Sequence, residues 1–128
     1  MDDKITIADH PAIRSLQFWH FVVQESVRTD GPDLTARQLA VLLSVFLTEP
    51  PHTVRGMAAD LKVGKPVITR AVKSLVKAGF VKRVRDETDR RNIFIQRTVR
   101  GAVYLSELAD RIWEADPDLH FPPAGDGT

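Results

Sequence analysis

The chain has 128 residues, of which 43% are hydrophobic and 27% charged, and its formal net charge is +1. These values are typical of one globular domain with a modest core. The absence of cysteine excludes disulfides, thiolate metal sites, cysteine nucleophiles and thiol redox sensing. No apolar run approaches the roughly 20 residues of a membrane span. The polar start at residues 1–4 is unlike a signal peptide, so a cytoplasmic protein is expected.

Charge is distributed unevenly along the chain. Thirteen basic and four acidic residues lie between His52 and Gly101, so this segment has a net charge of +9. The other five basic and thirteen acidic residues give the remainder −8. This asymmetry indicates a segment that binds a polyanion, joined to a part with another role.

The first predicted helix covers residues 11–28, after a flexible lead at 1–8. Asp9-His10-Pro11 is typical of a helix start, with proline near the first position. The apolar residues cover more of the circumference than one buried stripe needs. They are Ile13, Leu16, Phe18, Trp19, Phe21, Val22, Val23 and Val27. Either this helix passes through the core or it has a second apolar face for a partner, and core positions are favoured for Phe18 and Trp19.

Two further helices are predicted after the loop at 29–33. The second begins at Thr35, where Gln38 completes a capping box, and ends at Glu49-Pro50-Pro51. Its buried side comprises Leu39, Leu42, Leu43 and Phe46, with Leu47 beside them. The third is short, covers about 54–61, and is capped by Thr53. Its buried side comprises Met57, Ala58 and Leu61.

The stretch 64–79 predicts a fourth helix with two different faces. Pro66 suits its first position, and Gly79 suits the left-handed position just past its end. Ile68, Val72 and Leu75 recur at i, i+4 and i+7 and form the buried stripe. The opposite face offers hydroxyl, guanidinium and ammonium groups without an acid, which suits a DNA major groove. DNA contacts are assigned there to Lys65, Pro66, Val67, Thr69, Arg70 and Lys73; the alternative is a solvated basic face.

A short helix, a tight turn with glycine and a basic second helix form a helix-turn-helix. Two β-branched, basic runs follow at 80–85 and 93–97, and the charged segment 86–92 between them predicts an extended hairpin tip. Helix-turn-helix plus hairpin is a winged helix, a mainly α fold with a small β-wing. Wing arginines can enter a minor groove, so DNA contacts are assigned to Asp89, Arg90 and Arg91. Asp89 is placed to brace Arg91; the alternative is a surface ion pair that closes the turn.

The last predicted helix covers 99–115 and is capped by Thr98. Its apolar side comprises Ala102, Leu105, Leu108 or Ala109, and Ile112, with Trp113 adjoining. Residues 116–128 are rich in proline and glycine and predict a disordered tail. The expected organisation is one winged-helix domain over 9–115, with a DNA-binding lobe at 34–97.

These residues resemble the MarR-type winged-helix transcriptional regulators. The similarity covers about 34–101 and rests on "VGKPVITRAVKSLVKAGFVKR", "DETDRRN" and "RTVRG", in that order. The "TR…L…GFV" helix and the "DRR" wing are specific when they occur together. Two departures stand out: Arg97 occupies a position where the family usually has leucine, and one clear helix follows the wing where many members have two.

The resemblance implies a homodimer on palindromic DNA, usually a repressor, that a small aromatic ligand often releases. Thr69 and Arg70 match positions that meet DNA, and Arg91 matches the arginine that enters the minor groove, with Asp89 as its anchor. The terminal helices, 11–28 and 99–115, are implied to intertwine in the dimer. The implied dimer contacts are Ile13, Leu16, Trp19, Leu105, Leu108 and Ile112. The implied ligand pocket, between those helices and the DNA-binding lobe, is assigned to Arg14, Trp19, His20 and Phe46.

An enzyme is not expected. The four histidines, at 10, 20, 52 and 120, lack metal-ligand spacing. There is neither a nucleophile elbow nor a glycine-rich phosphate loop, and no cofactor or metal is expected. Two other functions stay open: a winged helix that binds protein, and a non-specific DNA-binding protein. The +9 segment argues against a protein partner, because protein interfaces need apolar area more than positive charge.

Overall fold

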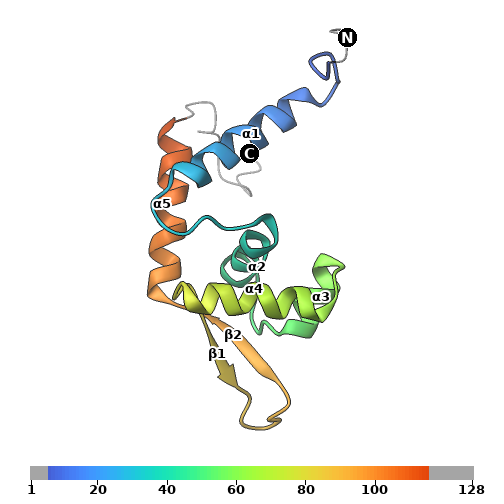
Figure 1. Cartoon of the computed structure of the whole chain (residues 1–128), viewed down its shortest axis with the longest axis vertical. Helices are drawn as coiled ribbons and strands as arrows, with labels where there is room; N and C mark the ends of the chain where they lie inside the picture. Colours follow the sequence, from blue (N-terminus) through green and yellow to red (C-terminus); the bar gives the residue numbers. More distant parts are fainter. Residues whose placement is uncertain (1–5, 116–128) are drawn as a thin grey trace, which may run out of the picture. The chain divides into compact units, whose positions relative to one another are not determined.

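The computed structural model describes residues 6–115, and its element order is that of a winged helix (Figure 1). The elements are α1 (Ile13–Arg28), α2 (Ala36–Leu47), α3 (Val54–Leu61), α4 (Lys65–Lys77), β1 (Val81–Arg85), β2 (Ile93–Arg97) and α5 (Val99–Ala115). A mainly helical fold with a two-stranded antiparallel sheet confirms the predicted fold class. The predicted tail at 116–128 and most of the predicted lead, residues 1–5, lie outside the described residues.

The chain divides into two compact units. One comprises residues 31–106 and contains the whole predicted DNA-binding lobe. The other combines the described residues before 31 with those from 107 to 115, so it contains α1 and the second half of α5. No helix among residues 6–115 has the length and apolar character needed to cross a membrane.

The core of the 31–106 unit forms where α2, α3 and α4 meet the foot of the hairpin. It comprises Val41, Leu42, Val45, Met57, Ala58, Ile68, Ala71, Val72, Leu75, Phe80, Val81, Ile95 and Tyr104. The buried stripe predicted for α4 is confirmed. Tyr104 stacks on Phe80, with ring centroids 4.6 Å apart. Burial raises the pKa of the Tyr104 hydroxyl, and the negative charge of Asp33 raises it further.

The buried faces predicted for α2 and α5 need correction. On α2 the fully buried residues are Val41, Leu42 and Val45, and Leu47 is 74% exposed. Leu39, Leu43 and Phe46, which the spacing assigned to the stripe, are only half-buried. On α5 Ala102 is exposed, and Tyr104 is buried instead. Because α2 has apolar residues almost all round, its periodicity alone does not define which side faces the core.

The predicted caps of three helices are present. At α2, the amide of Gln38 donates to the Thr35 hydroxyl (3.1 Å), and the Thr35 amide donates to the Gln38 side chain (2.9 Å). The hydroxyl of Thr53 caps α3 at the Gly56 amide (3.0 Å), and that of Thr98 caps α5 at Gly101 (3.0 Å). These bonds satisfy amides that have no partner within their own helix.

Helix α1 starts later than predicted. It begins at Ile13, after an N-cap residue, Ala12, that makes no side-chain capping bond. The Ala12 amide instead donates to Nδ1 of His10 (3.0 Å), so the segment 9–12 forms a turn rather than the first helical residues. The predicted start at Pro11 is therefore wrong by two residues.

Glycine ends α4 as predicted. Gly79 adopts φ 82°, the left-handed conformation that glycine tolerates. The Phe80 amide donates to the Leu75 carbonyl and the Gly79 amide to that of Val76, both at 2.9 Å. This is the Schellman arrangement, and it turns the chain directly into β1.

The hairpin is held at its foot by the segment that precedes α3. Strands β1 and β2 are antiparallel, in a register that runs from Val81 opposite Arg97 to Arg85 opposite Ile93. The Ile95 amide donates to the His52 carbonyl (2.8 Å), and Thr53 forms an isolated bridge with Phe94. The wing therefore lies beside the start of α3, which places its tip in reach of the α4 surface.

Candidate nucleic-acid interface

A polar hollow of about 240 Å³ lies between the starts of α3 and α4 and the wing. It is lined by Thr53, Val54, Arg55, Lys65, Thr69, Arg91, Asn92 and Ile93. Three predicted DNA contacts, Lys65, Thr69 and Arg91, thus come together from separate parts of the chain. Arg55 adds a third cation, and no acidic residue is among those lining the hollow. Such a surface favours a polyanion.

The outward face of α4 follows from its burial pattern. With Ile68, Ala71, Val72 and Leu75 buried, the side chains of Thr69, Arg70 and Lys73 point away from the core and are exposed, as are Lys65 and Pro66. Val67 was predicted on this face, but the structure contradicts this: Val67 is half-buried and lines a cleft toward α2.

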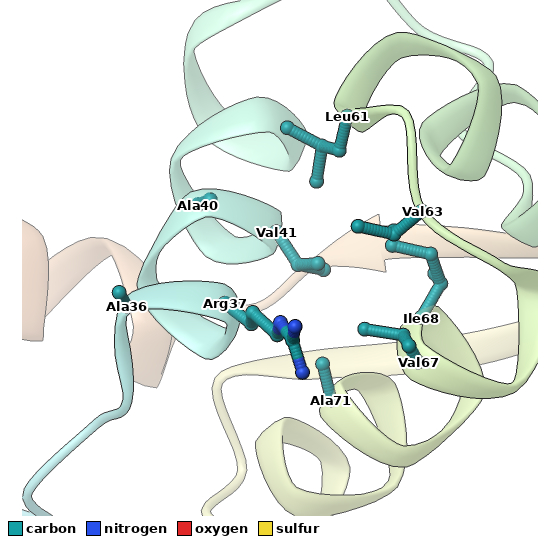
Figure 2. Close-up of a pocket in the computed structure, with 9 residues that line it drawn as sticks. All are labelled: Ala36, Arg37, Ala40, Val41, Leu61, Val63, Val67, Ile68 and Ala71. Atoms are coloured by element: carbon teal, nitrogen blue, oxygen red, sulfur yellow. The ribbon is translucent and has the colours of Figure 1, made fainter.

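That second cleft is apolar and has a volume of about 190 Å³ (Figure 2). Its lining residues are Ala36, Arg37, Ala40, Val41, Leu61, Val63, Val67, Ile68 and Ala71. Arg37 is the one charged residue among them, and Figure 2 shows its side chain extending from α2 toward Ala71. None of the residues predicted for a ligand pocket lines this cleft.

At the wing tip, Asp89 holds Arg91. Nε of Arg91 lies 3.2 Å from Oδ1 of Asp89 and Nη2 lies 3.4 Å from Oδ2, while the Arg91 amide donates to Oδ1 (3.1 Å). The Arg91 side chain is nonetheless 91% exposed. An ion pair this exposed contributes little to stability, so its effect is to restrict the orientation of the guanidinium. Arg90 is exposed beside it.

Comparison with known proteins agrees with this geometry. Residues 34–93 match the family model described as MarR family. Over these residues the chain is similar to the MarR family. A comparison with curated protein sequences finds no match.

Solved structures of transcriptional regulators share this MarR-type fold. The regulator Tm0710 from Thermotoga maritima is 25% identical, with 87% of this chain and 79% of its own covered and a TM-score of 0.67. PcaV from Streptomyces coelicolor, solved with its natural ligand, is 26% identical, with 95% and 86% covered and a TM-score of 0.60. A single-site mutant of MepR from S. aureus reaches a TM-score of 0.72, with 84% and 77% covered, and its 18% identity supports the fold alone.

Sequence reasoning missed three polar residues that line the hollow of this winged helix, Thr53, Arg55 and Asn92. Thr53 was interpreted only as a cap, and Asn92 only as part of the hairpin tip. Arg55 belongs to the +9 segment, which was the one available signal. The bridge between Thr53 and Phe94 joins the wing, and with it Asn92, to the start of α3. It is a long-range contact that no local pattern predicts.

Asp86 organises the wing tip through three hydrogen bonds. Its Oδ1 accepts from the Thr88 hydroxyl (2.7 Å) and from the Thr88 backbone amide (2.9 Å). Its Oδ2 accepts from the side-chain amide of Asn92 (3.5 Å). The bond from the Thr88 side chain, followed by that from its backbone, lowers the pKa of Asp86 from the ordinary value of 3.8. Hydrogen bonds of this kind favour the charged carboxylate.

We expect Asp86 to titrate below 3.8 in the folded wing. Because its folded pKa is depressed, its stabilising contribution is present above the unfolded pKa and is lost as the pH falls through the folded pKa. Thr88→Val should raise the Asp86 pKa, whereas Thr69→Val, a matched change on α4, should leave it unchanged. An NMR titration of the Asp86 carboxyl carbon measures both; a wild-type pKa at or above 3.8 would contradict the expectation.

In the unit that contains α1, the expectation of core positions for Phe18 and Trp19 is wrong. Phe18 is 44% and Trp19 is 52% exposed, and Leu16 is 48% exposed. Trp19 lines a hollow of about 360 Å³ together with Ile7, His10, Ala12, Ile13, Ser15 and Leu16. Arg14 and His20 are exposed, and Ile13 is half-buried. The ligand role assigned to Arg14, Trp19 and His20 stays a prediction.

The other predicted dimer and pocket residues differ in how much surface they offer. Leu108 is only 6% exposed, so little of it is free to meet a second copy. Leu105 packs against the core of its unit, and Ile112 is half-buried. Phe46, predicted for the ligand pocket, lies under the guanidinium of Arg97, 5.9 Å from the ring centroid. Within the described residues, no group of three or more His, Asp or Glu side chains is placed to hold a metal ion.

Proposed function

We propose that the chain is a transcription regulator that binds double-stranded DNA sequence-specifically as a homodimer and acts as a repressor. The main observation behind this proposal is the hollow near the starts of α3 and α4. Three cations, Arg55, Lys65 and Arg91, line it together with the hydroxyl of Thr69, and none of the lining residues is acidic. Cations and hydroxyls gathered on one surface suit phosphates and base edges.

In the proposed complex, α4 enters the major groove. Arg70 and Lys73 are exposed on its outer face, so they can reach base edges or phosphates that the hollow does not cover. Arg91, held out by Asp89, enters the adjacent minor groove, where the negative potential attracts guanidinium. Arg55 at the start of α3 contacts the phosphate backbone between these two sites, which positions the protein without reading sequence.

Support for the homodimer comes from the exposed apolar residues of α1. Leu16, Phe18, Trp19, Val23 and Val27 are between 38% and 66% exposed. Several large apolar residues exposed on one helix are typical of an interface, and a two-fold dimer would match a palindromic operator. The hollow beside Trp19 is the candidate place for a small aromatic ligand; PcaV, a similar structure, was solved with its natural ligand.

The decisive experiment selects bound duplexes from a random DNA pool at moderate salt. A palindromic consensus would support a dimeric, sequence-reading regulator. Binding without a consensus, which should weaken steeply with added salt, would favour a non-specific DNA-binding protein. Absence of binding even at low salt would favour the protein-interaction alternative and would sink the proposal.

Arg70→Ala is expected to change which sequence is preferred, as well as to weaken binding. A good contact between arginine and a base contributes about 1–3 kcal/mol of discrimination. The same selection, repeated with the variant, should lose preference at one position of each half-site. Lys77→Ala, the loss of an exposed cation in the last turn of α4, is the matched control and should leave the consensus intact. A consensus unchanged by Arg70→Ala would assign Arg70 to the phosphates.

A further inference from the structure

Arg97 connects the wing to α2, an element 49 or more residues away in sequence. Its Nε donates to the Val45 carbonyl (2.8 Å), and its Nη2 donates to the Thr48 carbonyl (3.2 Å). Val45 is in the last turn of α2 and Thr48 is its C-cap, where a helix leaves carbonyls without intrahelical partners. The Thr48 carbonyl also lies 3.2 Å from Nε2 of His52. A cation is favoured there by the helix dipole as well as by the hydrogen bonds.

Arg97 is exposed, and Phe46 supports its guanidinium. The guanidinium lies over the ring of Phe46, 5.9 Å from its centroid, within the range of a cation–π contact. A Cβ added at Gly101 would lie 2.8 Å from Cζ of the same ring. The end of α2, the last residue of β2 and the first turn of α5 therefore meet at Phe46.

The position of Arg97 relative to the DNA-facing residues decides its role. It is the last residue of β2 and pairs with Val81, so it lies at the foot of the hairpin whose tip bears Arg91. Helix α2 packs against α4 in the core. Together with the Ile95–His52 bond, a bond from the wing's foot to α2 restricts how the wing is directed relative to α4.

We propose that Arg97 is a positioning residue for DNA binding, which anchors the wing to the end of α2 so that Arg91 and α4 meet the same duplex. This inference rests on the proposed DNA-binding function. Arg97 need not touch DNA: it acts by restricting the angle of the hairpin. Leucine at this position has an apolar side chain that can contact Phe46, but it cannot bond the two carbonyls.

Arg97→Leu is the principal variant. It should weaken binding of the selected duplex by about tenfold, close to a difference of 1.4 kcal/mol. In an Arg91→Ala background the same change should cost less than about twofold, because a wing without Arg91 gains little from being directed. Arg97→Lys keeps the charge but lacks the fork of donors, and it should reproduce most of the loss.

Arg83→Leu is the matched control. Arg83 is exposed on β1, and its guanidinium makes no hydrogen bond or ion pair within residues 6–115. Removing it deletes the same charge from the same hairpin, so any effect should be equal in both backgrounds. Thermal unfolding of every variant shows whether the winged helix remains folded.

A second readout needs no DNA. The Ile95 amide, which bonds the His52 carbonyl at the wing's foot, should exchange its hydrogen faster in Arg97→Leu than in wild type. It should not do so in Arg83→Leu, and amides of α4 should be unaffected. Unchanged Ile95 exchange would overturn the anchor itself. An equal loss of affinity with and without Arg91 would overturn the positioning role, whereas failure of the wild type to bind any duplex would overturn the proposed function.

Discussion

Arg91→Ala is expected to weaken binding of the selected duplex by about tenfold or more, without changing the free energy of unfolding. A guanidinium in the narrow minor groove makes charge-assisted contacts that alanine cannot replace, and 1.4 kcal/mol corresponds to tenfold. The side chain is 91% exposed and its pair with Asp89 is a surface pair, so the fold does not depend on it. Fluorescence anisotropy with a labelled duplex, together with thermal unfolding, measures both quantities.

Asp89→Asn separates positioning from charge. It raises the net charge of the wing, so simple attraction to phosphate predicts tighter binding. If Asp89 instead orients Arg91 through the bonds at 3.2 Å and 3.4 Å, binding weakens despite the added positive charge. For Arg91→Ala, an unchanged affinity for the duplex would show that the wing takes no part in DNA binding.

Gly101→Ala is expected to destabilise the protein by about 3 kcal/mol, through overpacking. A Cβ there would lie 2.3 Å from the Phe80 carbonyl oxygen and 2.8 Å from Cζ of Phe46. The carbonyl belongs to the backbone between α4 and β1, so it cannot move away as a side chain would. The gain in helix propensity of about 1 kcal/mol offsets only part of this cost.

Denaturant unfolding of Gly101→Ala beside Gly64→Ala provides the comparison. A Cβ at Gly64 would meet Pro66 Cδ at 3.5 Å, an ordinary contact. Gly64 is the N-cap of α4, where alanine costs about 1 kcal/mol or less. Stability equal to or above wild type in Gly101→Ala would mean that α5 does not pack this closely on Phe46 and Phe80.

Features that depend on neighbours within a few residues could be predicted from the sequence. The capping box of Thr35 and Gln38 is one, and Gly79 at the end of α4 is another. The ion pair of Asp89 and Arg91 joins residues two apart, and the structure contains it. The buried stripe of α4 could be predicted because polar residues occupy the opposite face, so that only one orientation buries apolar area.

Helices with apolar residues on several sides were predicted less well. The sequence did not show which side of α2 faces the core, because its buried and its exposed residues are equally apolar. In α1 the surplus of apolar residues was recognised, yet core positions were favoured for Phe18 and Trp19, which are 44% and 52% exposed. Hydrophobicity measures what a side chain gains from burial, but it does not say which surface buries it.

By itself, the sequence determined the element order, the caps and the basic face of α4, because each follows from hydrogen bonds and spacing inside one segment. Only the tertiary structure decided that Arg55 lines the hollow with Lys65 and Arg91, and that Arg97 bonds the end of α2. These contacts join residues far apart in the chain, and they exist because the shared core brings α2, α3, α4 and β2 together. Core packing depends on many residues from separate segments at once, so no short stretch of the sequence specifies these contacts.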